Sequence, residues 1–238
     1  SKIIKKERTL FITGPGKNGI DGKKVYEIAK KNNFNVKLLD LSKKKTISDI
    51  EQSGKQFQDL LNCSSCIIDA IFGIGINRNV KGIFKKVILR VNSSNKFIIS
   101  IDLPSGINAD SGMIKGKAIN SKLTLCMGFY KPAHFLMPSK KNCGDLKLID
   151  IGLNSLKVKP NIRIISPQII KRFLPSNPID IHKHKKGNVL VFAGLMSGAS
   201  RLVALASRKI GAGLSTINIP EKYFRQYSGV EPGTIVDF

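Results

Sequence analysis

The chain has 238 residues, of which 42% are hydrophobic, so it can form one large domain, or one domain and part of another. Its 40 lysine and arginine residues outnumber its 16 acidic residues and give a formal net charge of +24. These values exclude a wholly disordered chain, and no apolar run is long enough to cross a bilayer.

The positive charge does not identify a partner by itself. The basic residues are dispersed along a lysine-rich and asparagine-rich chain, as an AT-rich genome produces, and they form no stripe interleaved with aromatic residues. Attraction for small anions explains the charge equally well, so we expect a small-molecule substrate and no nucleic acid or membrane. The chain starts at Ser1 rather than methionine, so we expect a processed or partial chain in the cytoplasm.

Short apolar runs alternate with segments of helical spacing over the first 150 residues or so. In chain order we predict strand 9–13, helix 22–33, strand 35–41, helix 46–61, strand 66–72, helix 80–94, strand 97–103, strand 123–129 and strand 145–151. This alternation favours an α/β fold with a Rossmann-like, mainly parallel sheet and helices on both faces.

The alternation of predicted strands and helices is interrupted by a proline-rich and basic segment, residues 154–186. This segment predicts a linker with a short helix near 166–174. The pattern then restarts with strand 187–194, helix 200–213 and strand 214–220. We therefore expect one domain at residues 1–153 and a second at residues 187–238, which is too short for a complete α/β domain.

Glycine-rich and polar segments follow four of the predicted strands: GPGKNGIDG, DAIFGIGINRNVKG, DLPSGINADSG and GFYKP. In an open parallel sheet, the segments after the strands meet at one edge, and ligands bind there. The sequence therefore predicts a binding site at the carboxyl ends of the strands.

The first of these segments, residues 14–22, matches no common phosphate loop well. It lacks the Lys-Ser/Thr pair of a P-loop, and its GxGxxG spacing is an isolated match, with Asp40 as the candidate acidic partner on the next strand. Its Asn18 and Asp21 side chains suit a ribose, a polar ring or a cation better than a phosphate.

Three oxygen-bearing side chains, Asn18, Asp69 and Ser105, lie at the carboxyl ends of different predicted strands or in the loops after them. A monovalent or hard divalent cation prefers such ligands. The alternative is that Asp69 caps a neighbouring loop and Ser105 caps a turn, and the residues alone leave both interpretations open.

The segment IDLPSG puts Asp102 at the end of a buried strand, where desolvation and neighbouring groups can tune a carboxylate for proton transfer. Its alternative role is to bond backbone amides of the glycine loop. Lys131, in YKP after the next strand, is a candidate to pair with Asp102 or with a ligand phosphate.

The cysteines and histidines show no metal-site spacing. Cys63 and Cys66 form a lone CxxC, and the remaining candidates stand apart, at Cys126, Cys143, His134, His182 and His184. We expect buried structural thiols rather than a redox pair or a zinc site, and a solvated linker at HKHKKG.

Several of these segments match one family in order and spacing. GPGKNGIDG resembles the GPGNNGGDG loop of the NAD(P)H-hydrate epimerase domain, the YjeF N-terminal family, and DAIFGIGINRNVKG, IDLPSGINADSG, GFYKP and CGDLKLIDIGL resemble its later segments. HKHKKGNVLVFAGLMSGASRLVALASRKIGAGLSTINIP resembles the start of the ADP/ATP-dependent NAD(P)H-hydrate dehydratase, a ribokinase-like domain.

The resemblance implies nicotinamide nucleotide repair. NADH and NADPH can add water to the nicotinamide ring, giving inactive hydrates as two epimers. The epimerase domain interconverts the R and S forms, and the dehydratase domain removes water from the S form using ADP or ATP.

The resemblance also assigns residues. Asp102 is the candidate acid/base, and Asn18, Asp69 and Ser105 would hold a potassium ion. The residues expected to bind the hydrate or the dinucleotide are Lys17, Asn18, Gly19, Ile20, Asp21, Gly73, Ile74, Gly75, Ile76, Asn77, Arg78, Asn79, Asp102, Lys131 and, at the start of the second domain's helix, Ala199.

The chain departs from the family pattern at Lys17, which replaces an asparagine, and at Ile20, which replaces a glycine. The family's N-terminal helices and the later nucleotide-binding segments of the dehydratase are also missing. If those helices close the pocket or form a homo-oligomer, we expect epimerase activity to depend on them. We therefore expect a fragment truncated at both ends, without dehydratase activity of its own. The alternatives are a catalytically impaired dinucleotide-binding or scaffold protein of the same fold and, last, a sugar kinase.

Overall fold

The computed structural model of the protein describes residues 8–42, 54–153, 162–174 and 181–238. The chain divides into two compact units, Ser1–Lys159 and Pro160–Phe238, and each has its own parallel sheet. Within these described ranges, no helix is both long enough and apolar enough to cross a membrane.

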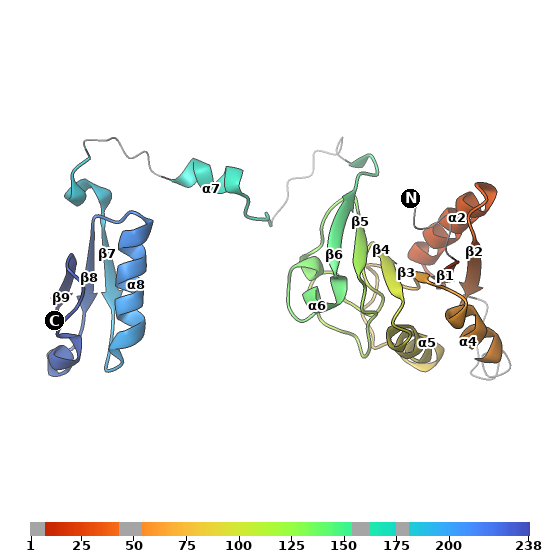
Figure 1. Ribbon diagram of the computed structural model, residues 1–238, viewed down its shortest axis with the longest axis horizontal. Helices are drawn as coiled ribbons and strands as arrows, with labels where there is room; N and C mark the ends of the chain where they lie inside the picture. The colour runs from red at the N-terminus through yellow and green to blue at the C-terminus, as the bar shows by residue number, and fades with distance from the viewer. Residues whose placement is uncertain (1–7, 43–53, 154–161, 175–180) are drawn as a thin grey trace. The chain divides into compact units, whose positions relative to one another are not determined.

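The first unit alternates strands and helices, as expected. Its elements are β1 (Thr9–Thr13), α2 (Lys17–Lys31), β2 (Val36–Asp40), α4 (Gly54–Asn62), β3 (Cys66–Ala70), α5 (Gly82–Ser93), β4 (Phe97–Ile101), β5 (Leu123–Met127), η1 (Pro132–His134), α6 (Lys140–Cys143) and β6 (Asp145–Ile149). The strands are all parallel, in the order β2-β1-β3-β4-β5-β6, which can be followed across Figure 1. The expected Rossmann-like sheet is confirmed.

Helices cover the sheet on both faces because successive residues of a strand point to opposite sides. In β1, Leu10 and Ile12 join a core that includes residues of α4 and α5, and Phe11 joins a second core that includes Tyr26 of α2. This two-sided burial explains why the predicted strands are nearly continuous apolar runs.

The element boundaries differ from the predicted ones in a consistent way. The helix expected to begin at residue 22 begins at Lys17, so the expected loop from Lys17 to Asp21 is the start of α2. Four strands begin where predicted, at residues 66, 97, 123 and 145. Each ends two residues earlier than predicted, because the chain turns out of the sheet there. Of the helix predicted at 46–61, residues 46–53 lie outside the described residues.

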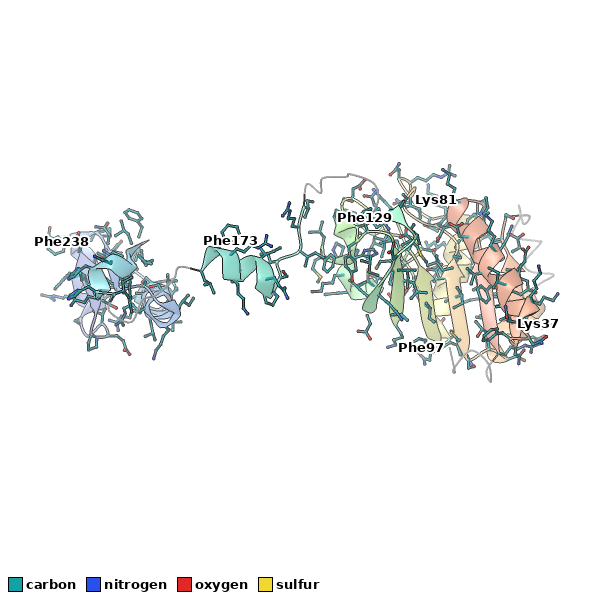
Figure 2. All side chains as sticks on the ribbon, turned by 90° about the horizontal axis from the view of Figure 1, so that it is seen from above. Lys37, Lys81, Phe97, Phe129, Phe173 and Phe238 are labelled. Atoms are coloured by element: carbon teal, nitrogen blue, oxygen red, sulfur yellow. The ribbon has the colours of Figure 1, made fainter. Side chains whose placement is uncertain are left out.

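The strand order reverses at β1, since β2 lies on one side of it and β3 on the other. The segments after β1 and β3 therefore diverge and leave a crevice at the carboxyl ends of the strands. In Figure 2, Lys81 and Phe129, which follow β3 and β5, lie at this end of the sheet, and Phe97, which begins β4, lies at the opposite end.

The second unit is smaller. It contains α7 (Pro167–Phe173), η3 (Lys183–Lys186), β7 (Asn188–Phe192), α8 (Ser197–Ile210), β8 (Leu214–Asn218), η4 (Glu221–Tyr227) and β9 (Thr234–Asp237). The strands β7, β8 and β9 are parallel neighbours in that order. The predicted strand, helix and strand are present, and β9 was not anticipated.

Only one face of this small sheet carries a packed core within the described residues. Ile217 and Tyr227 pack there with Ala204 of α8. On the other face Leu190 and Phe192 are exposed, Phe192 at 78%. Parallel sheets are normally covered on both faces, so this unit leaves an apolar surface open.

Candidate functional site

A cavity of about 830 Å³ lies in the crevice where the strand order reverses. It is lined by the start of α2, by the loop after β3 and by Asp102 after β4: Pro15, Gly16, Lys17, Asn18, Asp21, Phe72, Gly73, Ile74, Gly75, Ile76, Asn77, Arg78, Asn79, Val80, Lys81, Phe84 and Asp102. Its size suits a ligand larger than a simple sugar.

Most of the residues predicted to bind ligand line this cavity, including all of 73–79. Gly19, Ile20 and Lys131 do not: Gly19 is buried beneath Gly14, the side chain of Ile20 is 51% exposed outside the cavity, and Lys131 pairs with Asp102 at the cavity edge. Ala199 lies in α8 of the second unit, where it is exposed.

The glycines of the first segment allow backbone segments to approach one another. A Cβ on Gly14 would lie 2.0 Å from the carbonyl oxygen of Ile71, and one on Gly19 would lie 1.9 Å from the carbonyl oxygen of Gly14. A Cβ on Gly22 would lie 2.4 Å from that of Ala70. These glycines seat α2 against β3 and its loop, which is a packing role rather than a phosphate contact.

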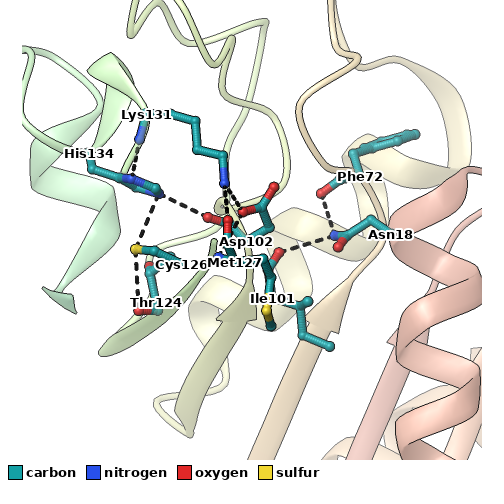
Figure 3. Close-up of polar contacts among 9 residues, drawn as sticks. All are labelled: Asn18, Phe72, Ile101, Asp102, Thr124, Cys126, Met127, Lys131 and His134. Atoms are coloured by element: carbon teal, nitrogen blue, oxygen red, sulfur yellow. Dashed lines mark hydrogen bonds and ion pairs between the residues drawn. The ribbon is translucent and has the colours of Figure 1, made fainter. Parts of the chain in front are cut away.

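Asn18 joins three of the strand ends. Its Nδ2 donates hydrogen bonds to the carbonyl oxygens of Phe72 at 2.8 Å and Ile101 at 3.2 Å, as Figure 3 shows. The side chain is buried at the base of α2 and also borders the cavity. It therefore holds the loop after β3 and the end of β4 in a fixed relation to α2.

Asp69, the fourth residue of β3, is buried beneath the cavity. Its carboxylate accepts hydrogen bonds from the Ser105 hydroxyl (2.5 Å), the Ser105 amide (2.9 Å), the Ser100 hydroxyl (2.7 Å) and the Ile71 amide (3.2 Å). Burial raises the pKa of this carboxyl group despite these bonds. Ser105 in turn accepts from the Phe72 amide at 2.8 Å, so Asp69 also braces the cavity loop.

Asp102 and Lys131 form an ion pair at the edge of the cavity. The Lys131 ammonium donates to Asp102 Oδ1 and, at 2.9 Å, to the Met127 carbonyl oxygen. Asp102 Oδ1 also accepts from the Met127 amide at 3.1 Å. Of the two partners considered for Lys131, the geometry therefore favours Asp102.

Asp40, the candidate ribose-binding acid, has other partners. Its carboxylate lies 2.8 Å from Lys23 Nζ and accepts from the hydroxyl and amide of Ser42 at 2.6 and 2.9 Å. It does not line the cavity, so the ordinary dinucleotide fingerprint with Asp40 as its acidic member is not formed.

One residue of this region was missed. His134 is fully buried, and its ring lies between the backbones of Asp102 and Lys131. Burial lowers the pKa of this histidine. The only signal in the sequence was its position three residues after Lys131, because no metal or catalytic spacing marks it.

The four cysteines differ in burial. Cys66, Cys126 and Cys143 are buried and Cys63 is exposed. Burial raises the pKa of Cys126 to about 11 and that of Cys143 to about 12, so both are neutral thiols. No group of three or more His, Cys, Asp or Glu residues in the described part of the chain is arranged to hold a metal ion.

Comparison with known proteins gives a consistent family. The family model described as YjeF-related protein N-terminus matches residues 1–133. The bifunctional NAD(P)H-hydrate repair enzyme Nnr of Synechocystis sp. is 32% identical over 232 residues, covering 90% of this chain and 44% of that protein. The NAD(P)H-hydrate epimerase of Oenococcus oeni is 29% identical over 164 residues, covering 64% of this chain and 78% of that protein.

Among solved structures, a crystal structure of yeast ynu0, YNL200c, has a TM-score of 0.47 at 20% sequence identity, with 74% of this chain and 76% of that chain covered. The chain spans less than half the length of the bifunctional relatives that it matches, at 44% and 49% for two of them.

Proposed function

The chain belongs to the family of YjeF-related protein N-termini, and on this premise we propose that its first unit interconverts the R and S epimers of hydrated NADH and NADPH. The observation that carries the proposal is the cavity at the reversal of strand order with the Asp102–Lys131 pair at its edge. The names of the Synechocystis and Oenococcus relatives support the choice of substrate.

The acid/base role falls to Asp102. Epimerisation inverts one carbon of the hydrated ring, so it needs a group that takes a proton from the substrate and returns it. Asp102 is the only acid besides Asp21 that lines the cavity in the described part of the chain, and Lys131 orients its carboxylate. The hydrated nicotinamide would therefore bind beside Asp102.

The dinucleotide's phosphates would bind along residues 73–79, which line the cavity and include Gly73 and Gly75. The N-terminus of α2 also faces the cavity, because Gly16 and Lys17 line it, and no side chain caps this 15-residue helix. Its unpaired amides and positive dipole end favour an anion. Lys17 and Arg78 add positive charge to the same cavity.

The residues expected to hold potassium fit such an ion. Ser105 Oγ lies 2.5 Å from Asp69 Oδ1 and 3.2 Å from the Phe72 carbonyl oxygen, to which Asn18 Nδ2 donates at 2.8 Å, so hydroxyl, carbonyl and carboxylate oxygens lie close together beside the Asn18 amide. Such oxygen donors suit a hard cation. An ion held by Asn18, Asp69 and Ser105 would supply a fixed positive charge beside the cavity.

The activity is tested by mixing the separated hydrate epimers with the 238-residue chain in KCl and following their exchange by NMR. We expect faster exchange than in buffer, and a loss of about 10²–10⁴-fold in Asp102→Asn, which keeps the shape of the side chain and removes its charge. No acceleration by the wild-type chain, or an unchanged rate in a folded Asp102→Asn, contradicts the proposal.

The ion is tested without activity. Thermal unfolding should occur at a higher temperature in KCl than in LiCl of equal ionic strength, because an ion that binds only the folded state stabilises it. Ser105→Ala should remove the difference between the salts. Equal unfolding temperatures of the wild-type chain in both salts would exclude a potassium site.

A catalytically impaired dinucleotide-binding protein is the second candidate. Lys17 favours it, because it lines the cavity where the family pattern has an asparagine, whereas Ile20 lies outside the cavity. Binding of NADPH without exchange of its hydrate epimers would establish this alternative.

The second unit would contribute to a dehydratase only as part of a longer protein. Ala199, at the start of α8, would touch the hydrate, and ADP or ATP would be the second substrate. The charge of +24 is compatible with these anionic ligands, and we propose that the chain does not bind nucleic acid. Strong DNA binding at physiological salt by the 238-residue chain would refute that part of the proposal.

A further inference from the structure

The strands β4 and β5 end in the same kind of turn. After β4, the Leu103 amide donates to the Ile101 carbonyl oxygen at 2.8 Å across Asp102, whose φ is +65°. After β5, the Phe129 amide donates to the Met127 carbonyl oxygen at 2.8 Å across Gly128, whose φ is +69°. Such γ-turns with positive φ are rare and strained, and only the second has a glycine at its centre.

Asp102 therefore needs neighbours that hold it in this conformation. Its amide donates to the Leu125 carbonyl oxygen at 2.8 Å, which fixes one side of the turn to β5. Its own carbonyl oxygen lies 2.9 Å from Nε2 of His134, which fixes the other side. His134 is fully buried, so water does not compete for this bond.

The second ring nitrogen of His134 binds the other member of the ion pair. The Lys131 backbone amide donates to His134 Nδ1 at 3.0 Å. A carbonyl oxygen only accepts and an amide only donates, so both bonds form together only when the ring is neutral and carries its proton on Nε2. Figure 3 shows the ring between the two backbones.

We propose that His134 is a positioning residue. It holds the strained turn at Asp102 and the backbone of Lys131, just before η1, in one fixed relation. The side chains of these two residues then meet at the cavity edge. The inference rests on the proposed function for its consequence in catalysis, but the geometry that it describes can be tested separately.

Two other roles fit less well. His134 does not line the cavity and is fully buried, so it does not touch the substrate. Its Nε2 lies 3.5 Å from Cys126 Sγ, but this thiol is held neutral by burial, and no third metal-ligating side chain in the described part of the chain joins the pair. A catalytic or metal-binding role for the ring is therefore not supported.

Two substitutions separate the two bonds. In His134→Gln the side-chain amide reaches the position of Nε2 and can still donate to Asp102. In His134→Asn the side chain reaches only the position of Nδ1, so it can accept from Lys131 but leaves the Asp102 carbonyl group without its partner. Thr124→Val is the matched control. It removes another buried side-chain hydrogen bond of the first unit, which the Thr124 hydroxyl donates to the Cys143 carbonyl oxygen at 2.6 Å.

In the exchange assay with the 238-residue chain, His134→Asn should lower kcat about 100-fold with KM nearly unchanged, because a small misplacement of a catalytic group has an effect of this size. His134→Gln should stay within about 10-fold of wild type, and Thr124→Val should lower stability without changing kcat. Equal kcat in wild type and a folded His134→Asn would overturn the proposal, as would an equal loss in Thr124→Val.

Two further measurements do not depend on activity, and the first of them needs no variant of His134. The ¹⁵N shifts of the wild-type ring should report a neutral imidazole protonated at Nε2, and a ring protonated at Nδ1 near pH 7 would overturn the proposal. The Leu103 amide should exchange with solvent faster in His134→Asn than in His134→Gln. If the wild-type chain shows no epimerisation but both results hold, the proposed function fails and the positioning role stands.

Discussion

At the scale of single residues, the backbone of Asp102 has an energetic consequence of its own. A non-glycine residue with φ of +65° is strained by about 1–2 kcal/mol, although aspartate tolerates this region better than most residues. The equivalent turn after β5 avoids the strain because it has Gly128. The chain therefore keeps a carboxylate where the fold alone would favour glycine, which is typical of functional sites.

A comparison of Asp102→Gly with Asp102→Ala measures this strain. Both substitutions remove the carboxylate and leave Lys131 without its partner, but only glycine relaxes the positive φ. We expect Asp102→Gly to be the more stable of the two by about 1 kcal/mol in urea unfolding, the reverse of their usual order. If Asp102→Ala is equally stable or more stable, the turn is not strained.

The residues of the site differ in how well the sequence predicts them. Asp102 and Asn18 could be predicted, because each follows an apolar strand and polar side chains at strand ends meet at one rim. His134 could not, because its role depends on which two backbone groups flank its ring, and no spacing in the chain encodes that. For the same reason the sequence left open whether Lys131 pairs with Asp102.

At the scale of elements, α2 shows how packing overrides local preference. Its first two turns contain Gly19 and Gly22, which disfavour a helix, and Gly16 provides no side-chain cap, so the sequence predicts a loop there. The helix forms because these glycines let it lie directly against Ala70 and Gly14. Its start could not be predicted from propensity, since part of the stabilising contact comes from Ala70 of β3, which is distant in the sequence.

Gly22→Ala tests this close packing. The new Cβ would lie 2.4 Å from Ala70 Cβ and 3.1 Å from Thr13 Cγ2, so α2 must shift away from the sheet. We expect a loss of about 1–3 kcal/mol in the free energy of unfolding of the first unit, measured with urea. Gly198→Ala is the control, because a Cβ there in α8 meets nothing within 4 Å, and it should leave the second unit as stable or slightly more stable.

Ile20→Gly restores the family's glycine in the first turn of α2. Because Ile20 has ordinary helical backbone and its side chain is 51% exposed, the glycine has no strain to relieve. We expect a loss of about 0.5–1 kcal/mol in stability and no gain in hydrate exchange. A clear increase in exchange rate would show that the isoleucine obstructs the site.

At the scale of the whole molecule, the sequence predicts the alternation of elements better than their number. The parallel sheet of the first unit follows from six apolar runs separated by helices or long loops, and its strand order places the cavity at the predicted rim. In the second unit β9 escaped prediction, because residues 234–237 alternate between exposed and half-buried side chains and form no apolar run. The exposure of Phe192 could not be predicted either, because it depends on which elements cover that face of the sheet, and the local sequence pattern does not contain this information.

The stability of the first unit should depend on pH through His134. Burial lowers the pKa of His134 in the folded state from its usual value near 6.5, so below that value the unfolded chain binds more protons. The stabilisation is complete above about pH 6.5 and is lost as pH falls toward the folded pKa, at no more than about 1.4 kcal/mol per pH unit. The titratable and charged groups that face the ring are Asp102, Lys131, Cys126 and Tyr130.

The measurement is urea unfolding of the wild-type chain and His134→Gln between pH 7.5 and 5, a range set around the ordinary histidine value of about 6.5. Groups such as Asp69, whose pKa burial raises, titrate in both proteins, so the difference between their free energies of unfolding isolates His134. We expect this difference to move in favour of His134→Gln as the solution is acidified, since glutamine cannot take up a proton. If the difference stays constant across the range, the buried ring accepts its second proton as easily as a histidine in the unfolded chain. That result would contradict the structure, because the two hydrogen bonds of the ring require it to be neutral.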